Sequence, residues 1–546
     1  MDPPKEDIKA EPICYDGSVL EGSQSQYDTD DAYLKSLGKS AELHRVYNFW
    51  TLCAYQVMIS ATWTCVVVFY GVIFDVGGPA SLLYGSIIVA IGQTLLMASL
   101  AEYCGIWPTA GGQQFYVQKL ATEKYRPFLS YFVGWCLLLA ETATGSSCAL
   151  NTANIIGTMV SIFHPNIDWK PYQTFLIYLG LLVIPFLMNL KPSALPFYST
   201  VGAVFTILGF FGWAITLLAT APKASAKFVF TQFINNSGYT NNGWVFILSF
   251  YSPLYGLYGT DSMMHLVEEM KNASQDAPRA MVWSMVLSGV ATIVTDLILL
   301  FCCGNYAEYV TALSPYVTWF SDVAGNEYAG IYVAIVFGVV NLLVCTGILS
   351  SCSRLGWRMA EDKAFPWSHR LQKIDHKLQI PLNFIFAIMV VEVIIGLISL
   401  GSELAYNAIV SGAGVCFALA YAIPVTVVST VHSRNHLAAD SSNRLLSEVA
   451  QFSPPRPHFD LGRWGYFVNY ISVAWALLTI VIYVMPLYLP VTGENIGNMN
   501  WAALIVGATF LFSGVWWVFG ARFRYLKETS FDTEPIPAAG EQSSSS

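Results

Sequence analysis

Two ionisable side chains follow a short stretch of this sequence that contains two glycines. Asp261 comes directly after residues 255–260, and His265 lies four residues further on. On a helix this spacing places Asp261 and His265 on one face, so the pair could pass a proton between them. A structural hydrogen bond near the end of the helix is the alternative interpretation.

A third ionisable group, Glu141, stands in an apolar stretch beside the small residues 142–145. Its carboxylate could neutralise a cationic ligand or carry a coupling proton. An ionisable group in apolar surroundings is unfavourable unless it is used, so its presence predicts function. Asp296 and Glu392 also lie in apolar stretches, where we expect structural partners or positions near helix ends.

The segment 250–261 predicts an interrupted helix. Pro253 removes a backbone donor, and two glycines leave the neighbouring backbone accessible. In a membrane such an interruption frees backbone groups that can bind a solute. The alternative is a plain kink, with Asp261 satisfied by neighbouring helices. The candidate substrate-binding residues here are Tyr255, Gly256, Tyr258, Gly259 and Asp261.

The composition indicates that membrane helices hold these residues. The chain is 55% hydrophobic and only 12% charged, whereas a soluble domain carries about 25% charged residues. Apolar runs such as 81–100 and 331–350 have the length of about 20 residues that a bilayer core requires. The sequence therefore predicts an all-α polytopic membrane protein.

Hydropathy predicts twelve transmembrane helices. Glycine and two serines at 145–147 predict that the third helix is broken or tilted. The predicted spans are 49–74, 79–102, 127–162, 172–190, 193–220, 243–267, 281–303, 326–352, 379–400, 404–431, 464–488 and 499–520.

The distribution of positive charge predicts the orientation. With the N-terminus inside, the cytosolic segments hold all of the 27 Lys and Arg except Lys170, Lys223 and Lys227. Cytosolic loops carry the excess of positive charge, so we expect both termini in the cytosol. We expect the plasma membrane, with the vacuolar membrane as the alternative. Asn235 then begins an outward-facing glycosylation sequon.

Five segments follow from this pattern. An N-tail (1–46), expected to be disordered and cytosolic, precedes a ten-helix core (47–432). A cytosolic loop (433–463), two further helices (464–520) and a cytosolic C-tail (521–546) complete the chain.

Other classes of function find no support in the motifs. The sequence contains no HExxH, GxSxG or nucleotide-binding loop, and no basic stripe for nucleic acid. Its 8 histidines are scattered, and its 11 cysteines lie mostly in apolar runs. We therefore expect no enzyme activity, no metal and no cofactor.

Many secondary transporters consist of two inverted five-helix repeats whose first helices are broken near the membrane midplane. Here helices 1–5 and 6–10 would form the repeats, so helix 1 should be broken as well as helix 6. Its middle is small and polar but lacks glycine, and ordinary small-residue packing is the alternative. The candidate substrate-binding residues are Ser60, Ala61, Thr62 and Trp63.

A series of short motifs runs in order along residues 48–525. They are Gly77-Gly78-Pro79, Ser99-Leu100-Ala101-Glu102, Pro108 to Gln114, Phe230 to Trp244, Asp261…His265…Glu268-Glu269, Ser353-Arg354…Pro366 and Pro490-Val491-Thr492. With these motifs the chain resembles the amino acid–polyamine–organocation transporters, and within them the fungal amino acid, choline and 4-aminobutyrate permeases.

The resemblance implies a fold of the leucine-transporter type, with substrate held between helices 1, 3, 6, 8 and 10. It implies secondary active transport of a small nitrogenous solute such as an amino acid, 4-aminobutyrate or choline, commonly driven by protons. Glu141, Asp261 and His265 are then the candidate proton-coupling residues. The alternatives are a permease-like nutrient sensor and a vacuolar amino acid exchanger.

One position departs from this pattern. Relatives often carry an acidic residue just after the Thr-Trp pair of helix 1, where this chain has Thr64. The departure leaves the charge of the substrate open. Glu141 could take the place of that carboxylate.

Overall fold

The structure is a computed structural model of the chain. It describes residues 34, 39, 42–310, 312–440 and 459–526. Most of the predicted N-tail (1–46), part of the predicted loop (433–463) and most of the predicted C-tail (521–546) lie outside the described residues.

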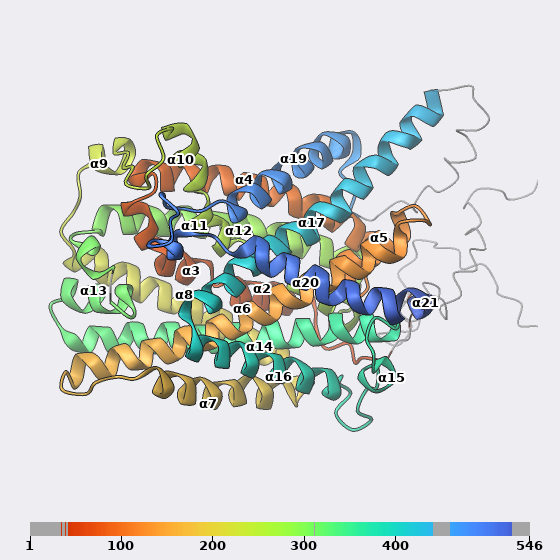
Figure 1. The fold of residues 1–546 in the computed structure, drawn as a ribbon, viewed down its shortest axis with the longest axis horizontal. Helices are drawn as coiled ribbons and strands as arrows, with labels where there is room; N and C mark the ends of the chain where they lie inside the picture. Colours follow the sequence, from red (N-terminus) through yellow and green to blue (C-terminus); the bar gives the residue numbers. More distant parts are fainter. Residues whose placement is uncertain (1–33, 35–38, 40–41, 311, 441–458, 527–546) are drawn as a thin grey trace, which may run out of the picture.

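The described residues form helices throughout, without a β-strand. Figure 1 shows the long helices running along the long axis of the molecule. At one end lie α5 (Gly112–Leu120) and α15 (Ser368–Leu371), and at the other lie α9 (Ala226–Thr231) and α13 (Pro315–Val323). These are called the α5 end and the α9 end below.

Eleven segments of the described chain are long and apolar enough to cross a bilayer. The first, Phe49–Phe74, comprises α2 (Phe49–Ser60), α3 (Thr62–Phe69) and the 3-10 helix η1 (Tyr70–Phe74). This pattern confirms the all-α polytopic membrane fold. The other ten are built around α4 (Gly78–Ile106), α6 (Arg126–Phe163), α7 (Pro171–Asn189), α8 (Leu195–Thr220), α12 (Ala273–Cys302), α14 (Glu327–Glu361), α16 (Leu382–Gly401), α17 (Glu403–Asp440), α19 (Gly465–Val484) and α20 (Ala502–Trp516).

The remaining predicted span, 243–267, is divided into three short helices. They are α10 (Asn242–Leu248), α11 (Tyr251–Gly256) and the 3-10 helix η3 (Ser262–Glu269). None of the three has the length of about 20 residues that a crossing needs. Gly259, between α11 and η3, has a φ of +74°, which glycine adopts without steric penalty. The predicted interruption of helix 6 is therefore confirmed.

Helix 1 is broken at Ala61, which separates α2 from α3. Its φ of 35° and ψ of 38° are left-handed, a conformation that costs an L-residue about 1–2 kcal/mol. The side chain of Thr64 donates a hydrogen bond of 2.7 Å to the Ala61 carbonyl, which occupies one backbone group at the break. The predicted interruption of helix 1 is present, although no glycine provides it.

The third transmembrane helix is not broken. Helix α6 is continuous over 38 residues, so of the two predicted alternatives, a break or a tilt, the break at 145–147 is wrong. A Cβ atom on Gly145 would lie 2.8 Å from Oε1 of Glu392 in α16. Glycine at this position therefore makes room for a carboxylate rather than ending a helix.

Helices α6 and α17 lie at the centre of the bundle. In each, 72% of an apolar 18-residue stretch is buried, against 11% for the corresponding stretch of the span built around α20. Helix α4 packs against α12, and α6 packs against α14. The second span thus pairs with the seventh and the third with the eighth, as two related five-helix repeats predict. Helix α17 continues to Asp440, into the segment predicted as a loop.

Close packing between α14 and α16 depends on Gly356. A Cβ atom there would overlap the buried ring of Phe384, so we expect Gly356→Ala to destabilise the protein by about 1–3 kcal/mol. The control is Gly180→Ala in α7, where a Cβ atom meets nothing within 4 Å and should stabilise slightly. Thermal unfolding of the detergent-purified protein measures both, and equal unfolding temperatures would contradict this packing.

Candidate functional site

A cavity of about 320 Å³ lies between the two helix breaks. This volume falls within the range of small-molecule sites. Its walls come from the breaks in spans 1 and 6 and from three further helices, which are α6 (span 3), α14 (span 8) and α17 (span 10). Tyr483 of α19 completes the lining. Six of the predicted substrate-binding residues line it: Ser60, Ala61, Glu141, Tyr255, Tyr258 and Gly259.

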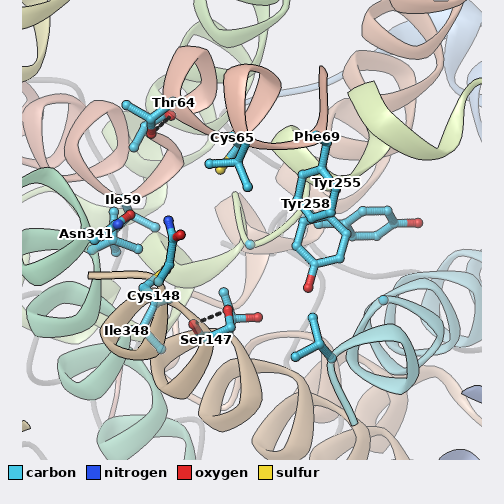
Figure 2. A pocket seen from close by; sticks show the side chains of 18 of the residues that line it. Ile59, Thr64, Cys65, Phe69, Ser147, Cys148, Tyr255, Tyr258, Asn341 and Ile348 are labelled. Carbon is cyan, nitrogen blue, oxygen red and sulfur yellow. Dashed lines mark hydrogen bonds between the residues drawn. The ribbon is translucent and has the colours of Figure 1, made fainter. Parts of the chain in front are cut away.

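Aromatic rings form one wall of the cavity. Figure 2 shows Phe69, Tyr255 and Tyr258 grouped on one side of the pocket. The ring of Phe69 lies 4.5 Å from that of Tyr255, and Tyr258 stacks on Phe417 at 5.8 Å, measured between ring centroids. Aromatic faces of this kind attract organic cations.

Uncharged polar side chains form much of the rest of the wall, and sequence reasoning did not name them as substrate-binding residues. Nothing in the one-dimensional pattern distinguishes them from other polar residues of a membrane helix. They are Thr64, Thr144, Ser147, Asn151, Asn154, Ser262, Asn341 and Asn407.

Trp63 points away from the cavity, although it was predicted to bind substrate. Its ring packs against Phe210, Trp213 and Phe337, with centroids 5.1–5.8 Å apart. Thr62 and Gly256 do not line the cavity either. A Cβ atom on Gly256 would lie 3.4 Å from the side chain of Cys65, which is an ordinary contact distance between α11 and α3.

Asp261, His265 and Glu141 lie together in a buried cluster, hereafter the acid–histidine cluster. Nε2 of His265 lies 3.8 Å from Oδ2 of Asp261 and 4.0 Å from Oε1 of Glu141. On the other side of the ring, Nδ1 lies 2.7 Å from the carbonyl oxygen of Ala110. A carbonyl only accepts, so Nδ1 carries a proton and Nε2 faces the two carboxylates.

Neutral donors surround both carboxylates of the cluster. Asp261 accepts hydrogen bonds from Tyr421 and, at 2.6 Å, from Gln113. Oε1 of Glu141 accepts one of 2.7 Å from Ser351. Oε2 of Glu141 has no partner among the described residues. Only Glu141 belongs both to the cluster and to the cavity wall.

The three side chains also offer a set of metal ligands, with one donor atom each within 4.8 Å of the others. Ligand atoms around a tetrahedral zinc ion lie about 3.3 Å apart. The distances from His265 to the carboxylates exceed this, and Gln113 and Ser351 already occupy oxygens of the two acids. Nε2 of His265 is also too far from both carboxylates for a hydrogen bond, so the contact between these three side chains is electrostatic.

The backbone of Ala110 connects this cluster to an ion pair at the α5 end. Its carbonyl accepts a hydrogen bond from His265, and its N–H donates a hydrogen bond of 2.8 Å to Oε1 of Glu268. The same oxygen accepts from Nε of Arg358 in α14, also at 2.8 Å. A Cβ atom on neighbouring Gly112, whose φ is +50°, would lie 2.9 Å from the His265 ring, so glycine is needed there.

Further buried ion pairs close the α5 end. Nε of Arg354 in α14 lies 2.7 Å from Oε1 of Glu269 in η3. This ion pair is beside the pair of Arg358 and Glu268. The amine of Lys39 lies 2.7 Å from Asp362, with both side chains buried. These pairs bind η3, and Lys39 in the segment before helix 1, to the end of α14.

Three other residues from the sequence analysis lie outside the cavity. Asp296 is buried in α12, and Glu392 is buried in α16 beside α6. The side-chain amide of Asn235 donates to the Tyr239 carbonyl at 2.8 Å, and Ser237 of the same sequon is fully buried. Hydrogen bonds to Tyr239 and Asn242 therefore hold the nitrogen that glycosylation would modify, and glycosylation of Asn235 stays a prediction.

A helical bundle in which two broken helices face a buried cavity defines a membrane transporter built from inverted repeats. The chain belongs to the amino acid permease family, whose sequence profile matches residues 47–510. It is 28% identical to amino-acid permease 2 of Neurospora crassa, over 92% of this chain and 90% of the relative.

Two further relatives match over similar lengths. Amino-acid permease BAT1 of Arabidopsis thaliana is 27% identical, over 91% of this chain and 95% of the relative. The choline transporter of Saccharomyces cerevisiae is 24% identical, over 92% of this chain and 86% of the relative.

The buried ion pair of Arg358 and Glu268 generates a stability prediction. Arg358→Met leaves Glu268 buried without its cation, which we expect to destabilise the protein by about 3–5 kcal/mol. The double variant Arg358→Met/Glu268→Gln should recover much of this loss, because it removes both charges. Thermal unfolding measures each variant.

The control for this prediction is Lys170→Met, which removes the cation of a solvent-exposed pair with Asp168 and should change little. A single Arg358 variant as stable as the wild type would show that the charge on Glu268 is not buried in solution.

Proposed function

We propose that this permease is a proton-coupled secondary active transporter of small nitrogenous solutes, working by alternating access. The observation that carries the proposal is the position of Glu141, which lines the cavity and also belongs to the acid–histidine cluster. A solute in the cavity and a proton in the cluster therefore act on the same carboxylate.

The charges in the cluster give coupling a physical reason. Asp261 and Glu141 contribute two negative charges to a site with no exposure to water, and buried charges are stable only when compensated. One proton on His265 compensates one carboxylate, and a cationic nitrogen in the cavity compensates the other. The cluster is neutral only when both are bound. The transporter changes conformation most easily when this buried site is neutral.

Three features of the cavity support a nitrogenous solute. Oε2 of Glu141 lacks a partner, aromatic faces lie nearby, and the described lining contains no Lys or Arg. The amino-acid permeases and the choline transporter among the relatives fit the same class. A substrate carboxylate would have to bind backbone N–H groups at the breaks, as helix N-termini allow.

The positive charge along the chain supports an orientation with the α5 end and both termini in the cytosol. The buried ion pairs of the α5 end then form the inner barrier, and Ala110 connects them to the acid–histidine cluster. We propose residence in the plasma membrane, with the vacuolar membrane as the alternative.

The substrate class can be tested by uptake in cells that lack their own permeases. Labelled choline, 4-aminobutyrate, polyamines and neutral amino acids form the panel, with and without a protonophore. We expect accumulation of one class, abolished by the protonophore. Proton-independent exchange would favour the vacuolar exchanger, and surface protein that carries no solute would favour the nutrient sensor.

Asp261→Asn tests the coupling. Removing one negative charge allows the cationic solute alone to neutralise the cluster, so accumulation should fall at least tenfold while equilibrating uptake and surface abundance persist. Glu392→Gln, a buried carboxylate outside the cavity, is the matched control and should keep accumulation. Proton-driven accumulation by Asp261→Asn at the wild-type level would refute the assigned role.

A further inference from the structure

The wall of the cavity opposite the aromatic rings contains an unpartnered amide. Asn341 of α14 is 7% exposed, and its Nδ2 has no hydrogen-bond partner among the described residues. Figure 2 shows Asn341 on one side of the pocket and Tyr255 and Tyr258 on the other. A buried donor without an acceptor is unfavourable by about 1–3 kcal/mol, so a ligand that supplies the acceptor gains affinity there.

A second amide on the facing helix strengthens this feature. Asn151 of α6 also lines the cavity, and α6 packs along α14. The hydroxyl of Tyr316 donates to Oδ1 of Asn151 at 3.1 Å. This bond uses the oxygen of the amide and leaves its NH₂ group for another acceptor. Two amide donors, one from α6 and one from α14, therefore line the same cavity.

The charge of the cavity decides which acceptor fits. Glu141 is the only acidic residue of the described lining, which contains no Lys, Arg or His. A carboxylate beside Asn341 would meet amide dipoles but no cation, in a cavity that already holds a negative charge. A hydroxyl, ether or carbonyl oxygen accepts from the amides without a charge penalty.

We propose that Asn341, together with Asn151, forms a subsite for an uncharged oxygen of the substrate. The subsite lies across the cavity from the aromatic wall, so the substrate carries its cationic nitrogen at one end and this oxygen at the other. The ligand class is a small organic cation with a hydroxyl or carbonyl group. This inference rests on the proposed transport of nitrogenous solutes. It adds the functional group that the solute carries at the end opposite its nitrogen.

The test compares two ligands in two proteins. Choline carries a terminal hydroxyl, and propyltrimethylammonium replaces it with a methyl group of similar size. Both are measured as competitors of uptake of the solute that the wild type carries. We expect choline to compete about tenfold better in the wild type, the value of one neutral hydrogen bond in a dry site. Asn341→Leu should remove this preference and leave propyltrimethylammonium unchanged.

A matched control uses another amide of the cavity wall. Asn407 of α17 lines the cavity but is exposed, so Asn407→Leu should keep the preference for choline. Surface abundance of each variant shows that it has folded.

Three outcomes would overturn the subsite. The preference could persist in Asn341→Leu, both ligands could weaken equally, or neither ligand could compete in a wild type that carries another solute. These outcomes differ from failure of the proposed function, in which the wild type carries no solute of the uptake panel.

Discussion

The structure depends on the need to compensate charges that are buried in the middle of a helical bundle. Asp261, Glu141, Glu268 and Glu269 are all nearly inaccessible to water. Such groups are stable in apolar surroundings only when donors and cations reach them. Tyr421, Gln113 and Ser351 supply neutral donors to the first two, and arginines of α14 supply cations to the last two. Ala110 connects the two sets, because its carbonyl accepts from His265, which faces the first two carboxylates, and its N–H donates to Glu268.

Much of the fold could be predicted because bilayer helices are specified by composition. Hydropathy located the spans, and Pro253, Gly256 and Gly259 indicated the break in helix 6. Gly145 misled the prediction of α6, because a glycine in a helix indicates either flexibility or close contact, and only the position of Glu392 distinguishes them. Ala61 is the opposite case, since no glycine indicates its left-handed backbone, a conformation that is costly for alanine.

The candidate site could be predicted only in part. Glu141, Asp261 and His265 attract notice in sequence because ionisable groups are rare in apolar runs. Asn151 and Asn341 do not, because uncharged polar residues occur throughout membrane helices and gain meaning only when two helices bring them to one cavity. Trp63 shows the limit of arguing from proximity along the chain. It lies two residues after the break, yet its side chain packs with Phe210, Trp213 and Phe337.

The ion pairs at the α5 end restrict how the bundle can open. Arg354 and Arg358 lie one turn apart on the same face of α14, and their partners Glu269 and Glu268 are adjacent in η3. Separating η3 from α14 therefore breaks both pairs together. In a dry interior each separation leaves uncompensated charge, whereas in water the attraction between the charges is weak. Opening of this end is thus favourable only as water enters it.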